Sequence, residues 1–214
     1  MTIPNRKQSF RLMINVVPAA EPAAFDAAVR QKGATWFAAK NLVGATKLPK
    51  NVSLPSYWTA ALDDLMESYD CVCAYASLRI HKITGGRSAD HFAPKSKALA
   101  AAYEWSNYRL ACRNLNARKR DFTDVLDPFQ VIPGTFILDA GDGSIKVSPA
   151  ITGSYRTLAQ STIDRLGLDS PAFRDERVEI IDDYLAGELG KKRLRKESPF
   201  IALELERQGI KPVP

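Results

Sequence analysis

Stretches of helical and strand-like apolar periodicity follow one another along this chain. From Ser53 to Tyr69, apolar residues recur every three or four positions, which predicts a helix with one buried stripe: Trp58, Ala61, Leu62, Leu65 and Met66. The segment from Cys71 to Ile80 has the pattern of a strand, Thr84-Gly85-Gly86 that of a turn, and Ser88 to Phe92 that of a second strand. These patterns predict a helix followed by a hairpin.

The second half of the chain alternates in the same way. A helix is predicted from Leu110 to Arg120, and a second hairpin from Thr135 to Val147 with its turn at Asp142-Gly143. Three later helices are predicted over Thr157 to Leu166, Ser170 to Leu189 and Ile201 to Arg207, and the buried stripes of the first two contain Ile163, Leu166, Val178, Ile181 and Leu185. The run KKRLRK, from Lys191 to Lys196, either contacts nucleic acid or is solvated.

The N-terminal quarter is less regular. Met1 to Val17 is interpreted as a short strand or an extended arm, Ala19 to Lys32 as a helix that Gly33 ends, and Thr35 to Lys50 as a short helix and a loop. We therefore predict a mainly helical α+β protein in three parts. These are an N-terminal arm and helix (1–52), a core (53–125), and a C-terminal hairpin and helices that pack on the core (126–214).

Composition narrows the class of partner. The 214 residues carry a formal net charge of +6 and give a pI near 9.2. A basic surface attracts nucleic acid through the release of counterions. Three cysteines without a regular framework favour a reducing cytoplasm. Because no apolar run of about 18 residues and no basic-then-apolar start occur, the sequence predicts neither a membrane span nor a signal peptide.

Five polar residues suited to phosphodiester hydrolysis fall within one short window: Asp90, His91, Asn107, Asn116 and Lys119. The reaction needs an activated water and a cation that neutralises charge on the phosphate. A neutral imidazole can take a proton from water near neutral pH, so His91 is the candidate base. Carboxylate and amide oxygens are hard ligands, which makes Asp90 and Asn116 candidates for holding one Mg²⁺ or Mn²⁺. Neighbours on a strand face opposite sides, so Asp90 and His91 share a site only at a strand end or bend.

The chain has only one other histidine, His81. It precedes the predicted turn and has no adjacent carboxylate in the sequence. We expect it to have a surface or structural role.

The run from Arg87 to Asp121, RSADHFAPKSKALAAAYEWSNYRLACRNLNARKRD, resembles the HNH or ββα-metal nucleases, in which a D-H pair is followed by an asparagine and then by N-x-x-K or H-x-x-K. The segments DHFAPKS, YEWSNYRLAC and NARKRDF, with TIDRLGLDSPAFRDER downstream, look like the branch found in bacterial anti-phage systems of the Septu and retron-associated type. The similarity covers Tyr57 to Tyr184, about 60% of the chain.

The resemblance implies a ββα-metal finger inside the core and a role for each motif residue. His91 would be the general base, Asp90 and Asn116 the metal ligands, Asn107 the residue that braces the loop and orients the base, and Lys119 a basic residue near phosphate. Six neighbouring basic residues are expected to contact nucleic acid: Arg87, Lys95, Arg109, Arg113, Arg118 and Arg120. The implied function is a metal-dependent endonuclease, with DNA favoured over RNA, that acts as a defence effector beside an SMC-like ATPase partner.

This chain departs from the resembling branch at its cysteines. Members usually carry two C-x-x-C knuckles, and tetrahedral zinc takes four ligands. Here the corresponding segments read Cys73-Ala74-Tyr75-Ala76 and Cys112-Arg113-Asn114-Leu115, so each lacks its second cysteine. With Cys71 the chain offers at most three thiolates, and we do not expect a structural zinc.

Two other functions stay open at this point. One is a non-catalytic subunit in which the finger serves binding or assembly, and the loss of both knuckle pairs favours it. The other is a ribonuclease, perhaps acting on tRNA, because nothing in the sequence reads bases or 2′-hydroxyl groups.

Overall fold

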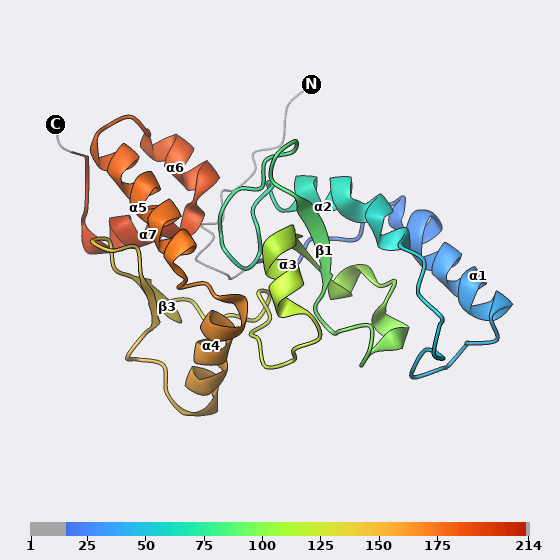
Figure 1. Ribbon diagram of the computed structural model, residues 1–214. Coiled ribbons are helices and arrows are strands. Elements are labelled where there is room, and N and C mark those ends of the chain that lie inside the picture. The colour runs from blue at the N-terminus through green and yellow to red at the C-terminus, as the bar shows by residue number, and fades with distance from the viewer. Residues whose placement is uncertain (1–15, 213–214) are drawn as a thin grey trace, which may run out of the picture.

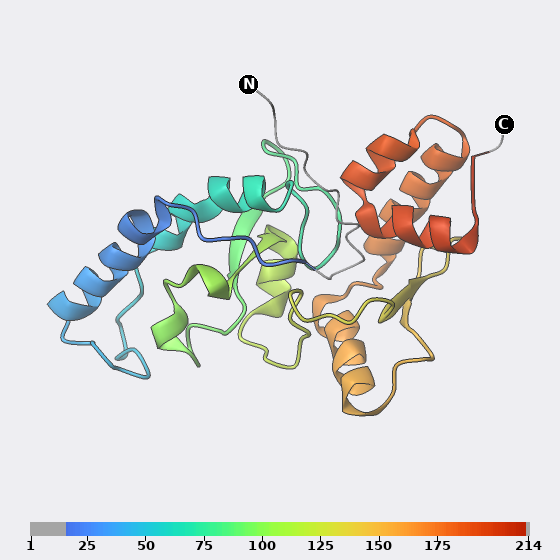
Figure 2. The same ribbon diagram turned by 180° about the vertical axis from the view of Figure 1, so that it is seen from behind.

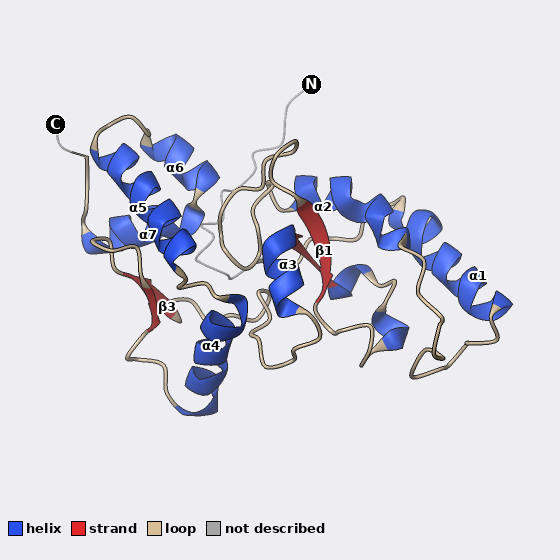
Figure 3. Cartoon of the chain, in the orientation of Figure 1, coloured by secondary structure: helices blue, strands red, loops and turns tan. Residues whose placement is uncertain are grey.

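The computed structural model describes residues 16–212, so most of the predicted N-terminal arm lies outside it. The protein is mainly helical α+β, as predicted: among the described residues, helices alternate with two small antiparallel sheets (Figures 1 and 3). The helices are α1 Gln31–Ala39, α2 Leu62–Ser68, α3 Arg113–Lys119, α4 Gly153–Leu166, α5 Pro171–Leu185, α6 Lys191–Glu197 and α7 Pro199–Gln208. The strands are β1 Arg87–His91 paired with β2 Tyr108–Cys112, and β3 Phe136–Leu138 paired with β4 Ile145–Val147.

The first sheet and α3 occupy the centre of the molecule. Helices α1 and α2 lie on one side of this centre and α5, α6 and α7 on the other, as the opposite views in Figures 1 and 2 both show. One continuous cluster of buried apolar side chains runs from Phe25 to Leu205 and includes residues of all three predicted parts. The central elements are therefore supported from both sides.

The N-terminal helix differs from the prediction at Gly33. A π-helical turn, Asp26–Arg30, leads directly into α1, and the helix continues through Gly33 to Ala39. A Cβ atom at Gly33 would lie 2.1 Å from Cδ2 of Tyr103. The glycine is therefore needed for a close aromatic contact and does not end the helix, which corrects the prediction.

The predicted helix from Ser53 to Tyr69 is shorter in the structure. It consists of a 3-10 turn, Tyr57–Ala61, followed by α2. Leu65 and Met66 are buried, which confirms the central part of the predicted apolar stripe.

The partner of β1 was predicted wrongly. The segment from Cys71 to Ile80 forms no regular strand, but only an isolated bridge between Val72 and Arg79. Positive φ angles at Asp70, Cys71 and Ser77 fold the segment back on itself. In its place Tyr108–Cys112, predicted in part as the beginning of a helix, pairs with β1, and α3 begins only at Arg113.

The C-terminal predictions are confirmed in outline. The second hairpin forms β3 and β4, and Gly143 in its turn has φ +68°, a conformation that favours glycine. Ile163, Leu166 and Ile181 are buried in α4 and α5, as predicted. Val178 and Leu185, also predicted to be buried, are only half-buried. Two buried residues of α5, Arg177 and Tyr184, were not predicted. Arg177 donates hydrogen bonds to the carbonyls of Gly143 and Leu168, and so fixes α5 to the hairpin turn.

The run KKRLRK forms most of α6, where Leu194 is buried and several charges are paired. Lys191 and Arg195 contact Glu206 of α7, and Arg193 contacts Glu197. Within residues 16–212, no helix is both long and apolar enough to cross a membrane.

Candidate active site

Strand β1 delivers Asp90 and His91 to the centre of the molecule. In the antiparallel register, Asp90 lies opposite Arg109 and His91 opposite Tyr108. His91 is the last residue of β1, and a long loop from 92 to 107 leads to β2, after which α3 follows at once. The two side chains have separate contacts, as expected for neighbours on a strand: Asp90 bonds to Tyr75 and Lys119, and His91 to Ala102.

The protonation state of His91 follows from its contacts. Its Nε2 atom lies 2.9 Å from the carbonyl oxygen of Ala102. A carbonyl oxygen only accepts, so Nε2 carries the hydrogen and Nδ1 of the neutral ring keeps a free lone pair. The ring packs edge to face against Trp58, at 4.9 Å between centroids, and against Tyr108, at 5.0 Å.

The electrostatic environment keeps His91 neutral. Burial lowers the pKa of His91 from 6.5 to about 3, and the positive charge of Lys95 acts in the same direction. The side chain is 7% exposed. In the free protein, His91 is therefore a neutral imidazole at physiological pH, with Nδ1 able to accept a proton.

Asn107 holds the loop that carries the acceptor of His91. Its Oδ1 accepts a hydrogen bond from the amide of Ala93 at 2.8 Å, and its Nδ2 donates to the carbonyls of Ala93 and Ala101 at 3.1 and 3.0 Å. Ala101 directly precedes Ala102, whose carbonyl also accepts a hydrogen bond from the hydroxyl of Tyr108. Asn107 therefore fixes both ends of the loop around the base.

Asp90 is buried and bonded at both oxygens. The hydroxyl of Tyr75 donates to Oδ2, and the ammonium of Lys119 lies 3.3 Å from Oδ1. Burial raises the pKa of Asp90, because loss of hydration outweighs the opposing effects of Lys119 and Tyr75. No sequence pattern marked the contact of Tyr75 with Asp90, because Tyr75 lies fifteen residues earlier in a segment predicted as a strand.

Lys119 is not at the surface where a phosphate would meet it. Its side chain is fully buried, and its ammonium donates to the carbonyls of His91 and Phe92 at 3.2 and 3.0 Å. Together with Asp90, these acceptors surround the charge. Lys119 therefore joins α3 to the end of β1 and is a positioning residue in this arrangement.

The donor types at Asp90 and Asn116 suit one hard divalent cation. Asp90 presents a carboxylate that can accept about four hydrogen bonds or ligand contacts, of which Tyr75 and Lys119 take two. Asn116, on α3, directs its Nδ2 toward the carbonyl of Ala89 at 3.4 Å, so the amide oxygen remains available as a ligand. The ammonium of Lys119 is the cation that already neutralises Asp90, and a metal ion would compete with it.

The described residues contain no group of three or more His, Cys, Asp or Glu side chains that could hold a metal. A metal at Asp90 would therefore rely on the amide of Asn116 and on water, as Mg²⁺ commonly does.

Lys95 and Trp58 form a cationic and aromatic edge beside His91. The ammonium of Lys95 lies 3.9 Å from the centroid of the Trp58 indole, and burial lowers the pKa of Lys95 while the charge of Asp90 opposes this. Trp58, predicted to be a core residue, is only partly buried and contacts the imidazole of His91. Lys95 is therefore a positive charge within electrostatic reach of both His91 and Asp90.

The structure separates the six basic residues expected to contact nucleic acid. Arg109 lies in the interior, 4% exposed, where it makes a paired contact with Asp127 and stacks on Phe129 at 3.5 Å. A surface role for Arg109 does not fit this position, because its guanidinium is enclosed by protein acceptors.

The other five basic residues lie nearer the surface. Arg118 donates to the carbonyls of Leu166 and Gly167 at the end of α4, and Arg87 pairs with Asp63. Arg113 and Arg120 are exposed at the two ends of α3. Lys95, Arg113 and Arg120 are therefore the members of the set that are best placed to meet a phosphate backbone.

His81, the second histidine, has a largely exposed side chain. Its Nε2 lies 3.9 Å from Oε2 of Glu197 on α6. None of its described contacts involves His91 or Asp90, which agrees with the expected surface or structural role.

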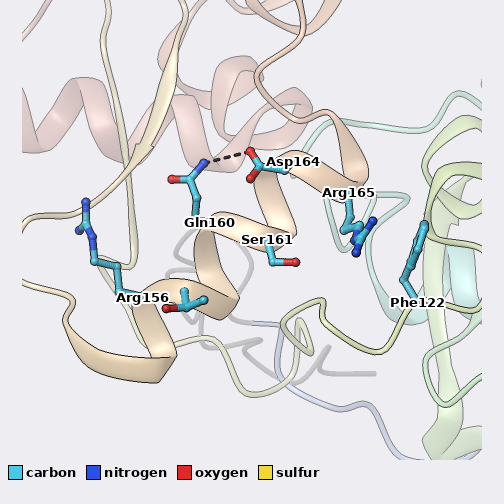
Figure 4. A pocket seen from close by; sticks show the side chains of 7 residues that line it. Phe122, Arg156, Gln160, Ser161, Asp164 and Arg165 are labelled. Carbon is cyan, nitrogen blue, oxygen red and sulfur yellow. Dashed lines mark hydrogen bonds between the residues drawn. The ribbon is translucent and has the colours of Figure 1, made fainter.

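A shallow groove of about 880 Å³ lies along α4, away from these residues (Figure 4). Within it, Arg165 stacks over Phe122 at 4.1 Å and pairs with Asp124, and Gln160 bonds to Asp164. Within residues 16–212, no hydrogen bond, ion pair or ring contact joins its lining residues to His91 or Asp90, and its lining charges are of both signs. The groove is therefore separate from the candidate active site.

Comparison with models of protein families and with curated proteins finds no match for this chain.

Proposed function

We propose that this chain is a metal-dependent endonuclease of the HNH type that hydrolyses nucleic acid, with DNA favoured over RNA. The observation that carries the proposal is the state of His91, whose Nε2–H is bound by the Ala102 carbonyl so that Nδ1 is left as a base. The order of β1, a long loop, β2 and α3 supports it, because this is the order of elements expected for a ββα-metal finger. By the same resemblance, we propose a cytoplasmic defence effector that acts beside an SMC-like ATPase.

In the proposed reaction, Nδ1 of His91 accepts a proton from the water that attacks phosphorus. Asn107 keeps the loop, and with it the Ala102 carbonyl, in the position that orients the imidazole. A pKa of about 3 makes His91 a weak base in the free protein. A phosphate bound beside the ring would raise this pKa, because a nearby negative charge favours the imidazolium. The base would therefore become stronger when the substrate is bound.

In the proposed reaction, Lys95 and a metal ion held by Asp90 and Asn116 would neutralise the negative charge of the phosphate. The ammonium of Lys95 is positioned by Trp58 beside the imidazole and supplies one positive charge there. Asp90 and Asn116 would hold a single Mg²⁺ or Mn²⁺, which when bound neutralises charge on the phosphate and the leaving oxygen. Tyr75 fixes the Asp90 carboxylate, and Lys119 fixes the backbone at His91 and Phe92.

A non-catalytic binding or assembly subunit is the second candidate function. The observation that favours it is the buried pair of Asp90 and Lys119, in which an ammonium already neutralises the carboxylate that would hold the metal. In such a subunit, α3 and its exposed arginines would still meet nucleic acid, while His91 would serve only packing.

The deciding experiment compares cleavage of supercoiled plasmid, single-stranded DNA and total tRNA in Mg²⁺ or Mn²⁺. The proteins are the wild type, His91→Ala, and His81→Ala as a matched control that removes the exposed imidazole. Cleavage that survives in His81→Ala and disappears both in His91→Ala and with EDTA is expected. The substrate that is cut also decides between DNA and RNA.

If no substrate is cleaved in any of these reactions, the same assay is repeated with a co-purifying ATPase. Activity that appears only then would support a restrained nuclease. If no substrate is cut with or without the partner while nucleic acid is still bound, the nuclease proposal fails and the non-catalytic subunit is favoured.

A further inference from the structure

Two cysteines outside the candidate active site lie against each other. Cys73 is in the folded-back segment before β1, and Cys112 is the last residue of β2. The amide of Cys112 donates to Sγ of Cys73 at 3.4 Å. The two thiols lie close enough that each shifts the pKa of the other. The amide of Ala74 also donates to the carbonyl of Leu110 at 2.8 Å, which holds the two backbone segments side by side.

The two thiols differ in a way that suits oxidation. Cys73 is 2% exposed, and burial raises its pKa well above the usual value, so it remains a protonated thiol. Cys112 is only partly buried. The neighbouring Cys73 thiol lowers the pKa of Cys112 below its ordinary value, against the opposing effect of burial. The backbone amides of Leu115 and Asn114 and the charge of Arg118 act in the same direction as Cys73. Since the thiolate is the nucleophile, Cys112 is the reactive member of the pair.

We infer that Cys112 and Cys73 are an oxidation-sensitive pair that forms an intramolecular disulfide in the presence of peroxide. In the first step the Cys112 thiolate attacks one peroxide oxygen. The S–O bond forms, the O–O bond breaks, and the departing hydroxide takes a proton from solvent to become water, so sulfur loses two electrons and peroxide gains them. In the second step the Cys73 sulfur attacks the Cys112 sulfenic acid. The S–S bond forms, the S–O bond breaks, and the hydroxyl group leaves with the Cys73 proton as water.

Cys73 and Cys112 lie close in the chain to residues that hold Asp90 in place. Cys73 lies two residues before Tyr75, which donates to Asp90, and Cys112 directly precedes α3, which carries Asn116 and Lys119. A disulfide would join these two segments covalently. The inference does not depend on the proposed function, because it rests on the thiols alone.

The test is intact-mass and peptide mass spectrometry of the full chain after treatment with hydrogen peroxide. We compare the wild type with Cys112→Ser, Cys73→Ala and the matched control Cys71→Ser, because Cys71 is buried without a described contact to another thiol. The wild type and Cys71→Ser are expected to lose two hydrogen atoms and to yield a peptide pair joined at Cys73 and Cys112. Cys73→Ala is expected to stop at a sulfenic acid that dimedone labels at Cys112, and Cys112→Ser to remain reduced.

A second measurement keeps the inference falsifiable if a variant does not fold. Iodoacetamide labelling of Cys112 in the wild type is expected to reach half its maximum well below the pH of about 8.5 at which an ordinary cysteine thiol titrates. A wild-type Cys112 that dimedone labels but that never forms the disulfide would overturn the pair, as would a disulfide that contains Cys71.

Discussion

Lowering the pH should destabilise this protein through His91. The folded-state pKa of about 3 lies below the ordinary value of 6.5, so between these values the unfolded chain binds a proton that the folded protein does not. Stability is therefore full above pH 6.5 and is lost as the pH falls towards 3. Each pH unit within this window changes the free energy of unfolding by about 1.4 kcal/mol.

The magnitude at a practical pH follows from the two pKa values. Between about pH 7.5 and pH 4.5, protonation of the unfolded histidine alone removes about 2.6 kcal/mol from the free energy of unfolding. Any folded-state pKa below about 4 gives nearly the same figure, because the folded protein then stays almost unprotonated across the window. A variant in which only the His91 imidazole is replaced keeps all other titrating groups. The difference in pH dependence between this variant and the wild type therefore reports His91 alone.

The assay is urea unfolding of the wild type, His91→Gln and His81→Gln at several values across this pH range. The wild type and His81→Gln should lose about 2.6 kcal/mol more than His91→Gln, whatever constant offset the loss of the ring introduces. Equal pH dependence of the wild type and His91→Gln would refute the reasoning, because it would mean that His91 titrates in the folded protein as it does in water.

Three further outcomes are expected. Lys119→Met should lower the free energy of unfolding by about 3–5 kcal/mol, because it leaves the Asp90 carboxylate buried without its cationic partner. Adding Asp90→Asn to this variant should recover part of the loss. Equal stability of the single and the double variant in urea unfolding would contradict the pairing. Asn107→Ala should abolish cleavage in the plasmid assay and lower the free energy of unfolding in urea by about 1–3 kcal/mol, because it removes the hydrogen bonds to Ala93 and Ala101. Full activity of this variant would mean that other contacts hold the loop. Gly33→Ala should lower the melting temperature by an amount equivalent to about 1–3 kcal/mol, because its Cβ would meet an aromatic ring at 2.1 Å. Gly190→Ala, which places its Cβ where no other atom lies within 4 Å, should leave the melting temperature nearly unchanged. Similar shifts for both variants would refute the packing argument.

Local patterns in the sequence were sufficient for several elements. The strand that ends at His91, the hairpin around Asp142-Gly143 and the buried stripe of α4 agree with the structure to within a few residues. Each depends on apolar periodicity or on turn chemistry within about ten residues, which the sequence displays directly. The types and spacing of Asp90, His91, Asn107 and Asn116 predict a candidate site, and its catalytic role stays a prediction.

Only the tertiary structure decided which distant segments meet. A period of two predicts that a strand exists but not which partner it pairs with, and β1 pairs with Tyr108–Cys112 because the segment from Cys71 to Ile80 turns back on itself. The sequence also does not predict the burial of Lys119 and Arg109, since a charged side chain is buried only where acceptors from other segments converge on it. For Lys119 these acceptors are Asp90 and two carbonyls of the chain at His91 and Phe92, which no pattern within α3 could reveal.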